Sequence, residues 1–366
     1  MSKTLSELAQ DLMLDEGKVH LIYAFNGTGK TRLSNEFKKL VQSSTSIDEN
    51  RKIIYYNSYT EDIFHWDNEI VIPTLNIYKN KFIDWINNIL YEDEKEEIIS
   101  HFQRYINNNK LTPNIDKDFS KVIFYYASGD NRAEEKIKIS KGEESNFIWS
   151  IFYTILDRVK ISYEESDDRF KSIKYIFIDD PVSSLDENHL IELAMDLAKI
   201  IKIIKSEVRV IISTHNPLFY NVLHNEFKKD DYKKYYLEKY GYGYGYGNEN
   251  EAYALIKQDN DHPFAYHIFL RKEIQKAIAN GTLQKYHFNF LRNLLEKTST
   301  YLGYKGWKDL LEAINKKTGN DFKPRLIDLN SHSAHSSEET SNLSDSDKNE
   351  VKKLIRAIDE FCNFVE

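Results

Sequence analysis

The sequence predicts an α/β fold with a mostly parallel sheet, followed by a second, smaller domain that is mainly helical. Apolar strands alternate with amphipathic helices through roughly the first two thirds of the chain, a pattern typical of layered parallel sheets. Beyond about residue 256 the apolar residues recur mainly at helical spacing. The 366 residues are enough for two hydrophobic cores, so we expect domains over residues 1–255 and 256–366.

The expected elements follow the chain in a regular order. Four buried strands are expected in the first domain, at Val19–Ala24, Ile53–Tyr56, Tyr175–Ile178 and Val208–Ser213. The helices expected beside them are Lys30–Leu40, Glu144–Val159 and Asn188–Lys205. A hairpin over Tyr232–Lys257 is followed by the helices Tyr266–Ala279 and Tyr286–Leu302, the polar stretch Asn330–Glu350 and a final helix. The order of elements between the second strand and about Asn131 stays open.

Composition and charge are those of a globular protein with one basic region. The chain has 41% apolar residues, 30% charged residues and a net charge of −8. It has no run of eighteen apolar residues, no signal-peptide pattern and a single cysteine, Cys362, so we expect a cytoplasmic protein without membrane contact. Ala265–Arg325 holds twelve Lys/Arg and five Asp/Glu, a local balance of +7. Such a segment is typical of nucleic-acid contact, although a solvated helical face accounts for the charge about as well.

A phosphate-binding loop is predicted between the first strand and the first helix. Asn26-Gly27-Thr28-Gly29-Lys30-Thr31 fits the P-loop pattern in the strand–turn–helix context that this loop requires. Glycines let backbone N–H groups converge on phosphates, the lysine neutralises them, and the threonine hydroxyl ligates Mg²⁺. We therefore expect these six residues, with Arg32, to bind ATP or GTP. Ala24 stands where the pattern has its first glycine; because it closes a strand, we expect its methyl group to be tolerated.

A carboxylate pair is predicted at the end of the third strand. Asp179 and Asp180 directly follow the apolar run Tyr175–Ile178. We expect Asp179 to hold Mg²⁺ through water and Asp180 to orient an attacking water for nucleotide hydrolysis. His215 follows the next strand. A lone histidine there is usually structural, but its place in this series of motifs indicates a second catalytic role.

Two more segments complete a resemblance to the ABC ATPases. Ser140, Gly142 and Glu143 open a helix and can offer backbone N–H groups to a nucleotide held by another copy. Asp186 ends the polar segment Ser183–Asp186, which resembles the D-loop of these ATPases. The resemblance implies an ABC-type P-loop NTPase that forms a head-to-tail homodimer around two nucleotides. A transporter subunit and a coiled-coil chromosome-maintenance ATPase do not fit, since the sequence has neither membrane spans nor a long heptad stretch.

The basic region contains a second set of chemically suggestive residues. Arg292 and Glu296 are four apart on the helix Tyr286–Leu302 and therefore share a face. His332 lies in the polar stretch that follows. A cation, an acid and a base can promote attack of an RNA 2′-hydroxyl on the adjacent phosphate without a metal. From the residues alone, however, a surface ion pair between Arg292 and Glu296 is the better interpretation.

Longer strings of residues resemble the bacterial anticodon nucleases of the PrrC type over nearly the whole chain. The strings are Leu21–Gly27, Tyr59–Asn68, Lys141–Trp149, Leu291–Leu294 with Glu296–Lys297, and Ser331–Ser333. The resemblance implies that Arg292, Glu296 and His332 form a metal-independent nuclease triad. It also places Asp259 against the wobble base of the substrate.

The resemblance implies a biological setting as well. The substrate would be a lysine-accepting tRNA, cut beside its wobble base to leave 2′,3′-cyclic phosphate and 5′-hydroxyl ends. A type I restriction–modification complex would hold the enzyme latent until phage infection. Hydrolysis of GTP or ATP would then activate it, dTTP would stabilise the active form, and oligomers beyond the dimer stay open. The alternative is a non-nuclease DNA-repair or structural ATPase whose C-terminal domain binds a partner.

Overall fold

The chain divides into two compact units. In the computed structural model they are Met1–Pro263 and Phe264–Glu366. The structure describes residues 3–43, 52–57, 64–67, 74–77, 86, 90–127, 135–162, 168–182, 187–204, 207–228, 231–240, 252–258, 266–331 and 343–364. The boundary expected between residues 255 and 256 falls inside the strand Ala252–Lys257. That strand pairs with a strand of the first unit, so the division comes after it.

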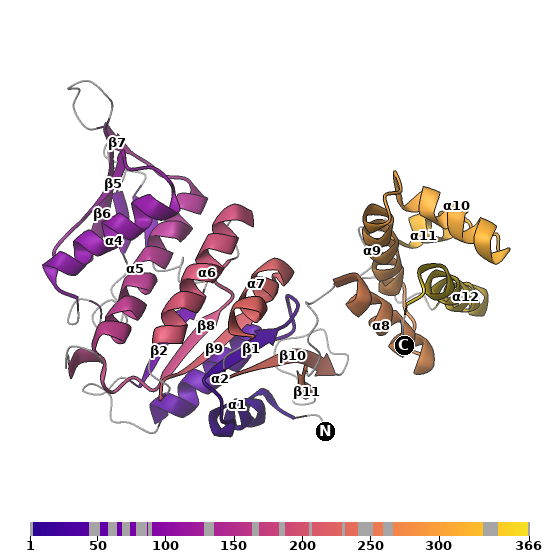
Figure 1. The fold of residues 1–366 in the computed structure, drawn as a ribbon, viewed down its shortest axis with the longest axis horizontal. Coiled ribbons are helices and arrows are strands. Elements are labelled where there is room, and N and C mark those ends of the chain that lie inside the picture. Colours follow the sequence, from indigo (N-terminus) through magenta and orange to yellow (C-terminus); the bar gives the residue numbers. More distant parts are fainter. Residues whose placement is uncertain are drawn as a thin grey trace. The chain divides into compact units, whose positions relative to one another are not determined.

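A six-stranded sheet forms the centre of the first unit (Figure 1). Its strands, in spatial order, are β11 (Ala252–Lys257), β10 (Tyr232–Tyr240), β1 (Val19–Tyr23), β9 (Arg209–Thr214), β8 (Tyr175–Asp179) and β2 (Ile53–Asn57). All neighbours are parallel except β10 and β11, which form the predicted antiparallel hairpin. Every residue of β1 is buried, as expected for a central parallel strand that is covered on both faces. The four predicted strands are confirmed, with ends that differ by one residue at most.

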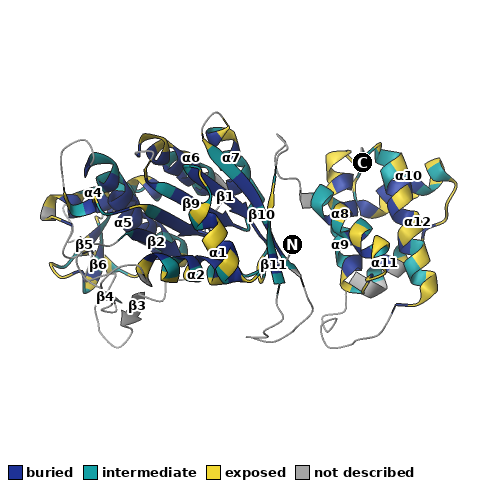
Figure 2. Cartoon of the chain, turned by 90° about the horizontal axis from the view of Figure 1, so that it is seen from below, coloured by how far each residue is buried: buried dark blue, intermediate teal, exposed yellow. Residues whose placement is uncertain are grey.

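Helices cover both faces of this sheet (Figure 2). One face carries α1 (Leu5–Leu14) and α2 (Lys30–Ser43), and the other carries α6 (Glu187–Ile203) and α7 (Pro217–Phe227). Leu8 of α1 and Phe37 of α2 are buried in one cluster with Ile22 of β1 and Phe177 of β8. The α1 helix, which the sequence analysis did not predict, begins at a capping box formed by Thr4 and Glu7. The predicted α2 and α6 are confirmed.

A second sheet fills the region whose order stayed open. Its strands are β3 (Phe64–Asp67), β4 (Thr74–Ile77), β6 (Lys121–Tyr126) and β5 (Leu111–Ile115), with β7 (Glu135–Ile137) also paired to β6. All its pairings are antiparallel. The helices α4 (Glu92–Tyr105) and α5 (Lys141–Ser162) pack against each other beside it. Phe102 of α4 and Phe147 of α5 join Phe124 of β6 in a cluster of rings 5.4–5.7 Å apart.

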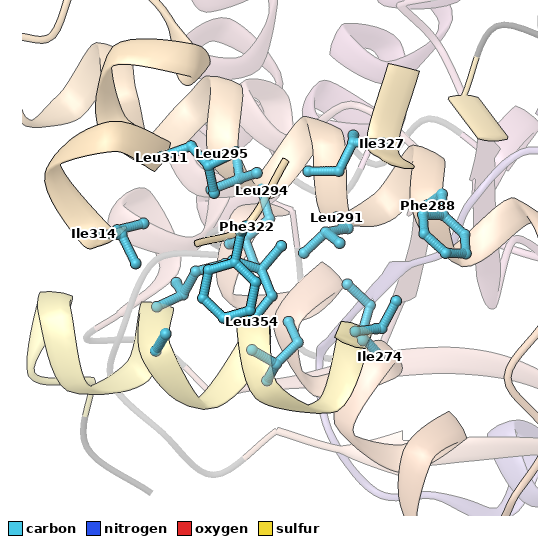
Figure 3. Close-up of a cluster of buried hydrophobic side chains, with 14 of the residues drawn as sticks. Ile274, Phe288, Leu291, Leu294, Leu295, Leu311, Ile314, Phe322, Ile327 and Leu354 are labelled. Carbon is cyan, nitrogen blue, oxygen red and sulfur yellow. The ribbon is translucent and has the colours of Figure 1, made fainter. Parts of the chain in front are cut away.

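The described part of the second unit is helical and has its own core (Figure 3). Its helices are α8 (Tyr266–Ala279), α9 (Tyr286–Tyr301), α10 (Trp307–Thr318), α11 (Pro324–Ser331) and α12 (Asp345–Cys362). Leu291 and Leu294 of α9 are fully buried in this core with Leu354 of α12. The α8 and α9 helices are confirmed. The stretch Asn330–Glu350, expected to be an irregular polar segment, begins inside α11 and ends inside α12.

Neither unit contains a membrane-spanning helix in its described residues, since none of their helices is both long enough and apolar enough.

Candidate active sites

The P-loop joins β1 to α2, and two of its glycines adopt conformations that other residues avoid. Gly27 has φ of +78° and Gly29 has φ of +106°. Only glycine populates this half of the conformational map freely, because it has no Cβ atom. A Cβ at Gly29 would lie 3.4 Å from the ring of Tyr253 and 3.6 Å from a methyl carbon of Leu5, which are ordinary contact distances, so the backbone conformation is what favours glycine there. The loop can therefore turn its N–H groups inward, as phosphate binding requires.

Lys30, the first residue of α2, is buried and folded back on the loop. Its Nζ donates to the carbonyl oxygens of Ala24 (3.1 Å) and Phe25 (3.2 Å) and to Oδ1 of Asn26 (3.3 Å). It also lies 3.5 Å from Oδ2 of Asp180. Burial lowers the pKa of Lys30, and the neighbouring carboxylates oppose that shift. The ammonium group is thus held by acceptors that the phosphate oxygens of a nucleotide can replace.

Two residues beside the loop have partners within the fold. Ala24, which replaces the first glycine of the pattern, is fully buried and donates its N–H to the carbonyl oxygen of Thr214 at 3.0 Å. Its methyl group is therefore part of the core. Arg32 donates to the hydroxyl of Tyr253 at 3.0 Å, which ties α2 to β11. Contact of Arg32 with a nucleotide stays a prediction.

Asp179 ends β8 as a fully buried carboxylate among hydroxyl groups. Ser213 donates to its Oδ1 at 2.5 Å, and Ser34 to its Oδ2 at 3.4 Å. Burial raises the pKa of Asp179, and hydrogen bonds from Ser213 and Thr31 oppose that rise. Hard oxygen donors are the ligands that Mg²⁺ prefers. The Asp179 carboxylate and the Thr31 hydroxyl lie within hydrogen-bonding reach of each other and so fit a magnesium site.

Asp180 is held in a left-handed conformation, with φ of +55°, which aspartate adopts more readily than most residues. Its Oδ2 lies 2.5 Å from Nδ1 of His215, and its Oδ1 accepts from the His215 N–H and the Thr214 hydroxyl, both at 3.2 Å. Burial disfavours the charged form of Asp180. The hydrogen bonds from His215 and the charge of Lys30 outweigh burial and lower the pKa of this carboxyl group. The structure thus brings together Lys30, Asp180 and His215, which belong to separate sequence motifs.

Ser140 and Glu143 meet each other at the start of α5. The N–H and the hydroxyl of Ser140 donate to Oε2 of Glu143 at 2.7 and 2.8 Å. In return, the Glu143 N–H donates to the Ser140 hydroxyl at 3.3 Å. This reciprocal arrangement is a capping box, which gives both residues a structural role, and Gly142 lies between them in the first turn. Asp186 lies outside the described residues, so contact of this group with a nucleotide stays a prediction.

Arg292 and Glu296 form an ion pair on α9. The Nε of Arg292 donates to Oε1 of Glu296 at 2.8 Å. Their side chains are partly exposed, at 24% and 42%, because the same helix turns Leu291, Leu294 and Leu295 into the core. The ion pair expected from the spacing is therefore present. Its partial exposure leaves both groups able to reach a bound molecule.

The structure adds three residues around Arg292 that the sequence analysis missed. Its Nη1 lies 3.5 Å from Oδ1 of Asp328 on α11, and its Cζ lies 5.7 Å from the ring centroid of Trp307 on α10. Lys308 binds the other oxygen of Asp328 at 2.9 Å and lies 5.4 Å from the same ring. The spacing of these three residues to Arg292 in the sequence gives no signal of these contacts, because they lie on α10 and α11 and Arg292 lies on α9.

Two residues predicted for the nuclease function lie outside the described part of the chain. They are His332, which directly follows the last residue of α11, and Asp259, which lies between β11 and α8. Their places in the site stay predictions.

Comparisons with known proteins agree with these features. The AAA-domain family matches residues 96–360. A protein of Escherichia coli named anticodon nuclease is 40% identical over 403 aligned positions, covering 100% of this chain and 98% of that protein. Similarity to solved structures is remote. The cbiO1 subunit of a Clostridium perfringens ABC transporter aligns with a TM-score of 0.35 at 15% identity, over 72% of this chain and 84% of that one.

The SMC head domain of Thermotoga maritima gives a TM-score of 0.31 at 13% identity, over 66% of this chain and 91% of that one. The relationship to the anticodon nuclease carries the family assignment, because it covers 100% of this chain and 98% of that protein. This chain, with a P-loop unit followed by a helical unit, therefore belongs to the AAA-domain family and, within it, to the anticodon nucleases.

Proposed function

We propose that the protein is a nucleotide-gated endoribonuclease that cuts the anticodon loop of a tRNA. The observation that carries the proposal is the 40% identity, along the whole chain, to a protein named anticodon nuclease. The paired Arg292 and Glu296 in the basic segment support it, because they supply a cation and a proton-transfer group on one helix. The finer assignment is a lysine tRNA cut beside its wobble base, with Asp259 contacting that base. It rests on the resemblance of the sequence strings.

The cleavage chemistry follows from the three triad residues. The 2′-hydroxyl attacks the adjacent phosphorus, and the bond from phosphorus to the 5′-oxygen of the next nucleotide breaks. Either Glu296 or His332 takes the 2′-hydroxyl proton, and the other gives a proton to the departing oxygen. Arg292 stabilises the extra negative charge of the phosphorane. The products are a 2′,3′-cyclic phosphate and a 5′-hydroxyl, formed without a resident metal.

Nucleotide hydrolysis is assigned to the first unit. The P-loop binds ATP or GTP, Thr31 and Asp179 hold the Mg²⁺ that neutralises phosphate charge, and Asp180 with His215 orients the attacking water. For phosphate to reach Lys30, the lysine must leave its present acceptors in the loop and at Asp180. Nucleotide binding therefore changes the contacts of the carboxylate that would carry out hydrolysis.

The proposed assembly and setting follow the ABC-type motifs and the resemblance. Two chains pair head to tail around two nucleotides, with Ser140–Glu143 and Asp186 of one chain facing the P-loop of the other, and larger oligomers can build on this dimer. A type I restriction–modification complex keeps the enzyme latent in the cytoplasm, and phage infection releases it. Binding of dTTP stabilises the active form.

The proposal is tested by incubating the full-length protein with lysine tRNA labelled at one end, with and without GTP or ATP. We expect a single nucleotide-dependent cut in the anticodon loop, with a cyclic phosphate on the upstream fragment. Arg292→Ala is the matched control and should cut the tRNA at least about a hundredfold more slowly. Hydrolysis of nucleotide while every tRNA stays intact would favour the alternative, a DNA-repair or structural ATPase with a partner-binding C-terminal unit.

A further inference from the structure

Arg292 is surrounded by groups from three different helices. Glu296 binds it from the same helix, Asp328 reaches it from α11, and Trp307 of α10 lies beneath its guanidinium group. An arginine side chain has several rotatable bonds, so a catalytic arginine needs external contacts that fix its position. Asp328 and Trp307 supply such contacts from the neighbouring helices.

Asp328 is itself fixed in place. Its neighbour Ile327 is buried in the core of the second unit at 1% exposure, which anchors α11. Lys308 binds Oδ2 of Asp328 at 2.9 Å. The carboxylate is thereby oriented with its other oxygen, Oδ1, toward Nη1 of Arg292 at 3.5 Å. The two cations share one carboxylate and one aromatic ring.

We propose that Asp328 is a positioning residue for Arg292 in the nuclease reaction, an inference that rests on the proposed function. Glu296 changes its charge during proton transfer, and in its neutral, protonated form it holds Arg292 only weakly. Asp328 takes no part in proton transfer and keeps its charge. It holds the guanidinium group of Arg292 over Trp307 while the phosphorane forms. The position of Arg292 therefore does not depend on the protonation state of Glu296.

Stability alone does not explain the arrangement. The Asp328 side chain is 31% exposed and Arg292 is 24% exposed, and partly exposed pairs of this kind contribute little to folding. Misplacement of a catalytic group by about 1 Å, by contrast, can cost about a hundredfold in rate. Loss of Asp328 should therefore affect the turnover number much more than the melting temperature.

The test compares Asp328→Ala, Asp328→Asn and Asp328→Glu in the full-length protein, with kcat and KM for tRNA cleavage measured separately. We expect Asp328→Ala to lower kcat about 10- to 100-fold and to change KM less than about threefold, since Asp328 does not contact the substrate. Asp328→Glu should recover more activity than Asp328→Asn because it keeps the charge. Asp321→Asn is the matched control, since this acid of the same unit pairs with Lys323 at 2.7 Å on the surface.

A double variant separates positioning from other roles. If Asp328 acts through Arg292, the variant Arg292→Ala/Asp328→Ala should cleave as slowly as Arg292→Ala alone. A further loss of activity in the double variant would overturn the inference. It would also be overturned if all three Asp328 variants lost the same amount of kcat and melted at a lower temperature. Wild-type kcat in Asp328→Ala beside an inactive Arg292→Ala would overturn it while the proposed function stands. Wild-type cleavage by Arg292→Ala would reject both.

Discussion

Replacing Asp180 with asparagine should stop nucleotide hydrolysis and leave nucleotide binding intact. The residue has φ of +55°, and asparagine tolerates this conformation as well as aspartate does. The amide oxygen can still accept from the N–H of His215 and the hydroxyl of Thr214, which now donate to Oδ1 at 3.2 Å. What the substitution removes is the negative charge beside His215 and Lys30 and the ability to take a proton.

The expected size of the effect follows from these contacts. Loss of a positioned general base lowers rates by about 10²–10⁴-fold. Nucleotide affinity should stay the same or rise, because a carboxylate 3.5 Å from Nζ of Lys30 no longer repels the incoming phosphates. Asp180→Ala loses the same charge but also places a less tolerant residue in the left-handed conformation, at a cost of about 1–2 kcal/mol. It should therefore melt about 2–8 °C lower than Asp180→Asn.

The assay combines steady-state phosphate release, binding of a fluorescent nucleotide and the mass of the complex by light scattering. We expect at least a hundredfold loss of hydrolysis and a nucleotide-dependent dimer that persists. Hydrolysis by Asp180→Asn at the wild-type rate would show that this residue is not the catalytic carboxylate. Failure to bind nucleotide would refute the reasoning about its conformation.

Three further predictions concern the first unit. Lys30→Ala should abolish nucleotide turnover and tRNA cleavage together, and cleavage that continues without nucleotide would defeat the gating proposal. Gly29→Ala should lower the melting temperature more than Gly27→Ala, because a φ of +106° lies further from the left-handed well than +78° does; equal melting temperatures would contradict this. Burial, with help from the charge of Arg104, lowers the pKa of His101 to about 4, so the unfolded chain takes up a proton that the folded chain does not. Stability should fall as the pH drops from about 6.5 toward 4, and His101→Gln should flatten that dependence in thermal melts.

Local motifs explain why residues predicted to bind and hydrolyse nucleotide lie close together in the structure. The P-loop, Asp180 and His215 each follow a short apolar strand. The carboxyl ends of neighbouring parallel strands lie at one edge of a sheet, so residues that end such strands are brought together. The register of β8 with β9, where Asp179 lies opposite Ser213, shows how this happens.

Long-range packing explains what could not be predicted. Asp328 and Trp307 reach Arg292 from separate helices, and nothing in their spacing to Arg292 marks that contact. The antiparallel sheet of the first unit has strands of only three to six residues, too short for a clear alternation of apolar and polar residues. Two helix starts, by contrast, are indicated by the sequence. The capping-box pattern of Thr4 and Glu7 indicates the start of α1, and that of Ser140 and Glu143 indicates the start of α5.

The most direct test of the central claim is cleavage of end-labelled tRNA by single variants of the three triad residues. Arg292→Ala, Glu296→Ala and His332→Ala should each lower cleavage by about a hundredfold or more. Their melting temperatures should hardly change, because the partly exposed Arg292–Glu296 pair contributes at most about 1 kcal/mol. His335→Ala, three residues beyond His332, is the control and should cut normally. Loss of cleavage in His335→Ala but not in His332→Ala would show that the wrong histidine was assigned. Normal cleavage by all three triad variants would contradict the account.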